Sequence, residues 1–132
     1  MTAAIKDRDT PLREAVQFAY SAKGGKVSFV GAMIAIDSGT GFAAPCTGAA
    51  TETVVGVNRY RTDTTGMADG AIGIEVRRGC YRFTNDTAAP YSSKDIGTAA
   101  HALDDSTVSK SGQSPAGIVR DIDANGDVWI EL

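Results

Sequence analysis

The sequence predicts a mainly β fold, a small antiparallel β-barrel or β-sandwich. Its 15 glycines and its many Thr, Ser and Val residues favour strands joined by frequent turns over long helices. Short apolar runs with alternating polar residues recur along the chain, and turn-forming residues separate them. The length of 132 residues is most simply one domain that can bury a core of its own.

The first 22 residues differ from the rest and are predicted to form an N-terminal extended arm. They are rich in charged side chains and contain few strand formers. A short helix is the alternative, because Thr10 can serve as its N-cap and Pro11 as its first residue. We favour the arm and assign residues 23–132 to a β-rich body. On this division, removal of residues 1–22 is expected to leave a folded body.

The body begins with β-branched and apolar residues. The segment GGKVSFVGAMIAID (24–37) predicts strand structure broken at Gly31. The segment TVVGVNRYR (53–61) predicts a strand in which Gly56 marks a bulge or a close approach of two backbones. The segment SAKGGK (21–26) is interpreted as a flexible joint rather than a phosphate-binding loop, since no Ser or Thr follows its last lysine.

The longest strand candidate is AIGIEVRRGCYRFTN (71–85). In it Ile72, Ile74 and Val76 are expected to share one face of the strand. Gly79 is expected to introduce a kink, after which Tyr81 and Phe83 continue the apolar face. One helical turn is expected within residues 92–96, followed by short strand structure. These elements continue the pattern of a β protein with many connections.

The last twelve residues, DIDANGDVWIEL, resemble part of a calcium-binding loop. An EF-hand loop needs oxygen ligands at alternate positions, a glycine at the sixth position and a glutamate at the twelfth. Asp121, Asp123 and Asn125 meet the first requirement, but the twelfth residue is Leu132 and Glu131 falls one place early. We therefore interpret the segment as a hairpin turn, with a weak cation site as the alternative.

The same segment predicts a C-terminal β-hairpin. Strand-like runs occupy 116–123 and 127–132, and the Asn-Gly pair between them is a strong hairpin signal. Along the second run, Val128 and Ile130 share one face while Trp129 lies on the other.

No catalytic constellation is evident in the sequence. The one histidine, His101, lies near Asp104 and Asp105, but no G-x-S-x-G nucleophile motif accompanies it. Cys46 and Cys80 form no C-x-x-C pair, and we expect two buried thiols rather than a disulfide. We therefore predict that the protein is not an enzyme and that it uses no cofactor and no metal.

The charge of the chain argues against nucleic acid as a partner. Its formal net charge is −3 and its pI is about 5.0. Two local basic segments, RYR (59–61) and VRRGCYR (76–82), are interpreted as solvent-exposed or interface faces. No stretch is long and apolar enough for a membrane span, and the N-terminus has no secretory signal. We expect a soluble protein made in a cytoplasm, with no membrane partner.

Two motifs and their order suggest a family. The pattern A-G-x-V-x-D-x-D-x-x-G-x-V-W-[IV] is met over 116–130, and RRG-x-[YF]-x-F is met over 77–83. Together with GAMIAID (31–37) and DIGTAAHALDDSTVSKS (95–111), they resemble the small head decoration, or capsid cement, proteins of Mu-like tailed bacteriophages. The resemblance covers roughly residues 23–132.

This resemblance implies a structural virion protein on the outer surface of the matured head. Such proteins are commonly homotrimers that bridge major-capsid subunits against the pressure of packaged DNA, and they carry no active site. A trimer multiplies weak contacts, and an arm can bind a capsid subunit or a neighbouring trimer by strand addition. The residues expected at the capsid or subunit interface are Arg8, Pro11, Leu12, Arg13, Val16, Phe18, Tyr20 and Trp129.

Two other functions are consistent with the same features of the sequence. The chain could be a tail or baseplate accessory β-module, which would differ from a decoration protein in location and copy number. It could also be a carbohydrate- or calcium-binding β-domain, in which Trp129 would serve as a platform for a sugar ring.

Overall fold

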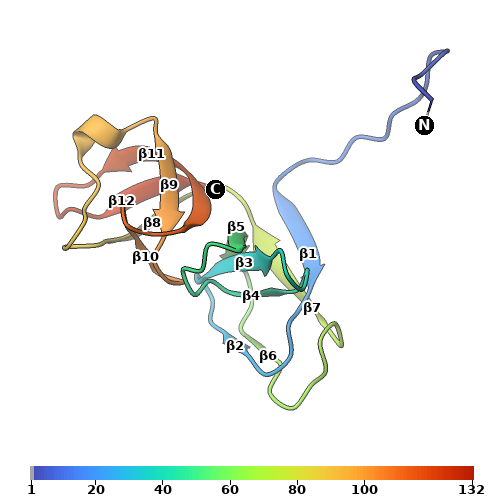
Figure 1. The fold of residues 1–132 in the computed structure, drawn as a ribbon, viewed down its shortest axis with the longest axis horizontal. Coiled ribbons are helices and arrows are strands. Elements are labelled where there is room, and N and C mark those ends of the chain that lie inside the picture. The colour runs from blue at the N-terminus through green and yellow to red at the C-terminus, as the bar shows by residue number, and fades with distance from the viewer. Residues whose placement is uncertain (1) are drawn as a thin grey trace.

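A computed structural model, which describes residues 2–132, shows a five-stranded sheet beside a closed five-stranded barrel (Figure 1). The sheet has the spatial order β1 (Gln17–Ser21), β7 (Gly73–Arg77), β5 (Glu52–Asn58), β3 (Met33–Asp37) and β4 (Ala43–Pro45). The barrel has the order β10 (Thr107–Val108), β8 (Cys80–Asn85), β12 (Val128–Glu131), β11 (Ser114–Ile122) and β9 (Ala99–Ala102). A small ribbon pairs β2 (Val27–Ser28) with β6 (Thr62–Asp63), and Ser93–Asp95 form one 3-10 turn, η1.

The prediction of a mainly β fold is confirmed, and so is the helical turn expected within residues 92–96. Neighbouring strands of the sheet are antiparallel throughout. In the barrel, β8 and β10 form one parallel pair, and the other pairs are antiparallel.

Two apolar clusters lie on opposite faces of the sheet. Along β3, Met33 and Ala35 pack into the larger cluster, which fills the barrel and its contact with the sheet. The residues that alternate with them, Ile34 and Ile36, pack into the smaller cluster on the other face. Because successive side chains of a strand point to opposite faces, β3 is buried on both sides. This strand therefore joins the two halves of the molecule.

The sheet curls until its two edges meet. Ala22, just after β1, bridges Ala43 of β4, and the backbone N–H of Lys23 donates to the Ala43 carbonyl at 2.8 Å. This closure encloses the smaller cluster, whose largest members from β7 are Ile74 and Val76. The curl needs a strong local twist, which a bulge in β5 supplies.

That bulge lies where the sequence placed it. The pairing of β5 with β3 passes from Gly56 opposite Ile34 to Val54 opposite Ala35, so that Val55 has no direct partner. A Cβ on Gly56 would lie 3.0 Å from the Cβ of Val76. Both interpretations of Gly56, a bulge and a close backbone approach, are confirmed.

The long strand candidate 71–85 divides into two strands. β7 ends at Arg77 in the sheet, and β8 begins at Cys80 in the barrel, so the chain crosses between the two halves at Arg78 and Gly79. The expected kink is therefore a change of sheet. Val76 faces the smaller cluster, whereas Phe83 faces the larger one.

The C-terminal hairpin is confirmed as β11 and β12. Its turn has three residues rather than the two-residue form typical of Asn-Gly. The N–H of Gly126 donates to the Asp123 carbonyl at 2.9 Å, and the N–H of Asp123 donates to the Asp127 carbonyl at 2.8 Å. Only Gly126 has a positive φ, 96°, which fits a type I turn followed by a glycine bulge.

The arm is shorter than predicted. Residues 17–21 form β1, which pairs with β7 along its whole length, so the body begins at Gln17 and not at Lys23. Phe18 and Tyr20 alternate with exposed neighbours and cover the smaller cluster. Residues 2–14 adopt neither strand nor helix. A short helix there would have no surface to bury its apolar side against, and isolated short helices are marginal in water.

Two further expectations are corrected. The segment 21–26 is no flexible joint, because the Gly24 N–H donates to the Asp69 carboxylate and the Gly25 N–H donates to the Thr64 carbonyl, both at 2.8 Å. Both cysteines are free, but only Cys46 is buried, while Cys80 is exposed. Burial raises the pKa of the Cys46 thiol.

Replacing Gly117 with Ala is expected to destabilise the barrel strongly. Gly117 has a φ of 152°, and a Cβ there would lie 2.0 Å from the carbonyl oxygen of Glu131 on the neighbouring strand. We expect a loss of at least about 3 kcal/mol in the free energy of unfolding, measured by urea denaturation. Gly73→Ala is the control, since its Cβ would meet nothing closer than 3.6 Å. Equal stability of the two variants would contradict the assigned backbone of β11.

Replacing Asp105 with Asn is expected to raise the melting temperature at neutral pH. Burial raises the pKa of the Asp105 carboxyl, and the charge of Asp104 adds to the shift. A raised folded-state pKa means that the charged form destabilises the fold above that pKa. The gain should shrink as the pH falls through the raised value and vanish below the ordinary value of 3.8. Asp7→Asn, in the arm, is the charge-matched control; a gain that persists in acid would refute the assignment.

Candidate interaction site at the base of the arm

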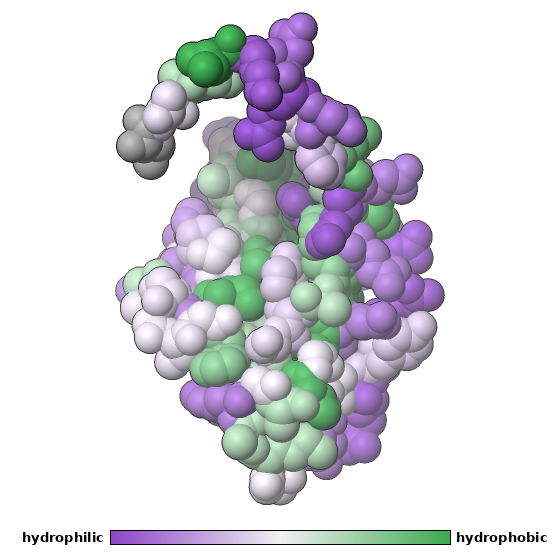
Figure 2. Space-filling view, turned by 90° about the vertical axis from the view of Figure 1, so that its right-hand side faces the viewer, coloured by the Kyte–Doolittle hydropathy of each residue, from purple (hydrophilic) through white to green (hydrophobic). Residues whose placement is uncertain are grey.

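The arm presents apolar side chains to solvent. Leu12 is 96% exposed and Ile5 is 90% exposed, although most large apolar residues of the body are buried or half-buried. In Figure 1 the arm runs away from the sheet, and in Figure 2 it stands off from the body with apolar groups among charged ones. Exposed leucine and isoleucine on an extended segment offer apolar area that a partner surface can bury.

The arm is fixed to the body at its C-terminal end. The Arg78 backbone N–H donates to the Val16 carbonyl at 2.7 Å, and β1 follows immediately. The Phe18 and Tyr20 rings are stacked, with centroids 6.1 Å apart and 20° between their planes. The arm therefore leaves the body from a rigid strand.

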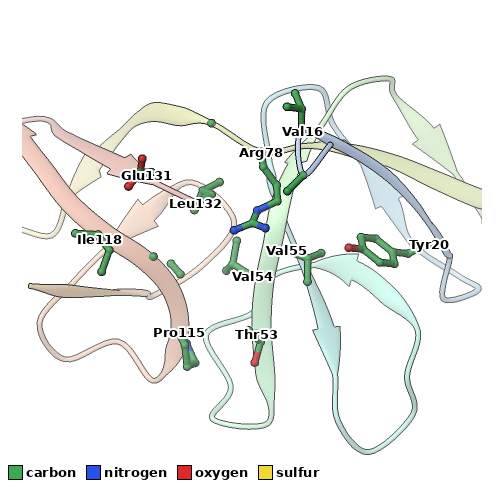
Figure 3. A pocket seen from close by; sticks show the side chains of 14 residues that line it. Val16, Tyr20, Thr53, Val54, Val55, Arg78, Pro115, Ile118, Glu131 and Leu132 are labelled. Atoms are coloured by element: carbon green, nitrogen blue, oxygen red, sulfur yellow. The ribbon is translucent and has the colours of Figure 1, made fainter. Parts of the chain in front are cut away.

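A cleft of about 680 Å³ lies beside this junction, between the sheet and the barrel (Figure 3). We call it the arm-base cleft. Its lining comes from β1, β5, β11, β12 and the crossing between β7 and β8: Ala15, Val16, Tyr20, Thr53, Val54, Val55, Arg78, Gly79, Pro115, Ala116, Gly117, Ile118, Glu131 and Leu132.

The floor of the arm-base cleft includes a strand edge with an open stretch. β7 pairs with β5 only at Val57 and Asn58, so residues 52–56 pair with β3 on one side and with no strand of residues 2–132 on the other. Figure 3 shows Thr53, Val54 and Val55 along this stretch, between β11 and β1. An open strand edge presents backbone donors and acceptors that an extended peptide can pair with.

The cleft is mostly apolar, with one unpaired charge. The Glu131 carboxylate accepts a hydrogen bond from Arg120 Nε at 3.0 Å. The Arg78 side chain, which Figure 3 shows reaching across β5, has no carboxylate partner in the described chain. An extended segment with an acidic group would complement this arrangement.

The structure brings together only some of the predicted interface residues. Val16 and Tyr20 line the arm-base cleft, whereas Phe18 packs on the smaller cluster. Trp129 is half-buried on the outside of the barrel, where its Nε1–H donates to Asp123 Oδ1 at 2.9 Å, and it lies outside the cleft. The others are exposed on the arm: Arg8, Pro11, Leu12 and Arg13.

Sequence reasoning missed most of the cleft. Arg78, Pro115, Ile118 and Leu132 come from segments distant in the chain, and only the packing of the barrel against the sheet brings them together. Arg78 carried a signal, since it lies in the basic segment 76–82 interpreted as a possible interface face.

The residues considered for catalysis take part in the structure of the barrel. The His101 backbone N–H donates to the Tyr91 hydroxyl at 2.9 Å, and that hydroxyl donates to the Ser109 carbonyl at 3.0 Å. The Asp104 carboxylate accepts the N–H groups of Ser106 and Thr107 in the turn between β9 and β10. These contacts fix the turn.

The acidic side chains of the C-terminal hairpin are likewise engaged. Asp123 accepts the Trp129 indole N–H and lies 3.4 Å from Arg82, while the Asn125 side-chain oxygen accepts the Asp127 N–H. Within residues 2–132, no group of three or more His, Cys, Asp or Glu side chains is arranged to hold a metal ion.

No family model, curated protein or solved structure matches the chain. In the part that the structure describes, no helix has the length and apolar character needed to cross a membrane.

Two deletions separate the arm from the sheet. Removal of residues 2–14 is expected to leave the melting temperature unchanged, because these residues pair with no strand. Removal of residues 1–22 takes β1 away and uncovers Ile74 and Val76, so the expected loss is about 3 kcal/mol or more. Thermal unfolding followed by circular dichroism measures both. A stable protein after the longer deletion would restore the original boundary at residue 22.

Proposed function

We propose that this chain is a structural virion protein that binds the outside of a mature phage head and stabilises contacts between major-capsid subunits. The arm is the observation that carries the proposal. It exposes Leu12 and Ile5 almost completely and leaves the body from a rigid strand. A segment of this kind buries its apolar side chains when it becomes ordered on the surface of another protein, and this burial favours binding. The motifs over 77–83 and 116–130, which resemble those of decoration proteins of Mu-like phages, support the same proposal.

The proposed assembly is a homotrimer on the outer capsid surface. A standard stable interface buries about 1,600 Å² in total, or about 800 Å² from each partner, and the chain has a solvent-accessible surface of 7928 Å². Three linked copies would present three arms, so modest contacts would add up to firm attachment. The arm-base cleft supports this arrangement, because its open strand edge gives a neighbouring segment a place to pair.

The carbohydrate alternative has less support. A sugar platform uses the open face of an aromatic ring, and Trp129 is half-buried with its indole N–H bound to Asp123. The proposal for a tail or baseplate module predicts the same fold and differs in where the protein is found.

The test is co-sedimentation of the purified protein with undecorated heads of the parent phage, both expanded and unexpanded. We expect saturable binding to expanded heads alone, at about one copy per major-capsid subunit, and weaker binding after removal of residues 2–14. Leu12→Asp with Ile5→Asp keeps the arm length and tests its apolar contacts. Absence of binding to either head form would overturn the capsid proposal, and detection of the protein in purified tails would favour the tail module.

A further inference from the structure

The fold brings the two basic segments of the sequence together. Arg77 of β7 lies opposite Val57 of β5, and the Arg59 N–H donates to the Glu75 carbonyl at 3.1 Å. Arg82 follows on β8 after the chain has crossed to the barrel. Residues of the segments 59–61 and 76–82 therefore share one surface, although residues 62–75 separate them in the sequence.

A groove of about 340 Å³ runs between these arginines. We call it the arginine groove. It lies on the junction of sheet and barrel and is lined by Val30, Gly31, Val57, Asn58, Arg59, Arg77, Tyr81, Arg82 and Phe83. Val57 and Phe83 are buried, so the groove has an apolar base and a rim of guanidinium groups.

Exposed apolar residues lie in the lining of the groove or next to it in the sequence. Val30 is 65% exposed, Phe29 57% and Tyr60 54%. Arg61 lies over the Phe29 ring at 5.6 Å, and Arg59 lies over the Tyr60 ring at 5.2 Å. Such stacking holds a guanidinium in place while leaving its N–H groups free to bind an oxygen ligand.

The buried side chain of Asn58 holds Phe29 and Val30 in their exposed positions. Asn58 is almost completely buried, and its Nδ2 donates to the carbonyls of Ser28 and Phe29 at 2.9 and 3.0 Å. The Gly31 N–H donates back to the Asn58 carbonyl at 3.0 Å. These bonds fix the turn that presents Phe29 and Val30, so the surface is already shaped before a partner arrives.

The arginines lack acidic partners. In the described residues no carboxylate oxygen lies within 4.0 Å of the guanidinium nitrogens of Arg59, Arg61 or Arg77. Arg82 is the exception, with Asp123 at 3.4 Å and Asp127 at 3.8 Å. In a chain of net charge −3, three arginines without an ion-pair partner near one groove are an uneven distribution of charge that an acidic ligand would balance.

We propose that the arginine groove binds an acidic peptide segment of a partner protein. An apolar side chain of that segment enters the groove, and carboxylates on either side of it in the peptide bind the arginines. Arginine forms paired hydrogen bonds to carboxylates, and Arg and Tyr are enriched among residues that dominate binding energy at interfaces. The apolar base of the groove takes the inserted side chain, and the rim takes the charges on either side.

A peptide fits these observations better than nucleic acid. Asp123 and Asp127 lie beside Arg82 and interrupt the positive surface, whereas a nucleic-acid backbone requires a continuous basic track. The groove also has the size of one or two side chains rather than the width of a duplex.

The inference rests on the proposed function only for the identity of the partner, which would be the major capsid protein. The groove adds a second attachment point besides the arm. The two are linked by a side-chain hydrogen bond, because Arg59 of the groove donates to the side chain of Gln17, the first residue of β1. An arm and a groove on the same protein would bind two separate features of one capsid subunit or of adjacent ones.

The first experiment uses a defined probe, a fluorescein-labelled peptide of about twelve residues in which Asp and Glu surround a central Leu-Phe pair. Fluorescence anisotropy is expected to show saturable binding that weakens with added salt, and no binding of the same peptide with Asn and Gln in place of the acids. Arg59→Gln with Arg77→Gln should weaken binding about tenfold or more. Both side chains are exposed, so the fold should persist.

Lys94→Gln with Arg120→Gln is the control, because it removes the same charge from η1 and β11, which do not line the groove. An equal loss of affinity for the peptide in this control would mean that binding depends on the overall charge and not on the groove, and it would overturn the proposal. So would absent binding of the acidic peptide, or tighter binding of a labelled single-stranded DNA that the same arginine substitutions abolish.

The same variants in head co-sedimentation keep the two proposals apart. If heads bind the parent and the Arg59→Gln, Arg77→Gln variant equally, the groove is not the capsid contact while the decoration role stands. If the peptide binds but heads do not, the groove stands and the capsid role falls.

Discussion

The structure depends on a single layer of strands buried on both faces. β3 and β5 contribute alternate side chains to the larger cluster in the barrel and to the smaller cluster under the curled sheet. Met33 and Ala35 pack into the cluster that fills the barrel, and Ile34 is fully buried in the cluster under the sheet. The bulge at Val55 lets β5 contribute side chains to both clusters, because the extra residue changes which side chains point to each face of the sheet.

Both candidate binding surfaces arise where the two halves meet. The chain passes from sheet to barrel at Arg78 and Gly79, and the arm-base cleft and the arginine groove lie beside this crossing. A curved sheet and a barrel cannot match along their whole contact, so grooves remain at its margins. A groove between packed elements has rigid walls, and this property is what a surface for protein recognition requires.

Local signals in the sequence predicted local structure well. Asn125-Gly126 predicted the hairpin, Gly56 the bulge, and alternation the buried faces of Val128 and Ile130. The sequence did not predict features that depend on pairing between segments far apart in the chain. The boundary of the arm was misplaced because QFAYS is a short strand that is stable only beside β7, and charged neighbours obscured its alternation. The two basic segments could not be joined without knowing that Arg77 lies opposite Val57.

The way the arm enters the sheet also has a mechanical consequence. The strand that follows it, β1, pairs with β7 from Gln17 to Ser21, and Ala22 beyond it bridges Ala43 of β4. Tension applied along this strand from the arm is shared by the whole ladder at once, because its hydrogen bonds lie across the direction of pull. The arm can therefore act as a tether, whose anchorage in the body resists load by shear rather than opening one bond at a time.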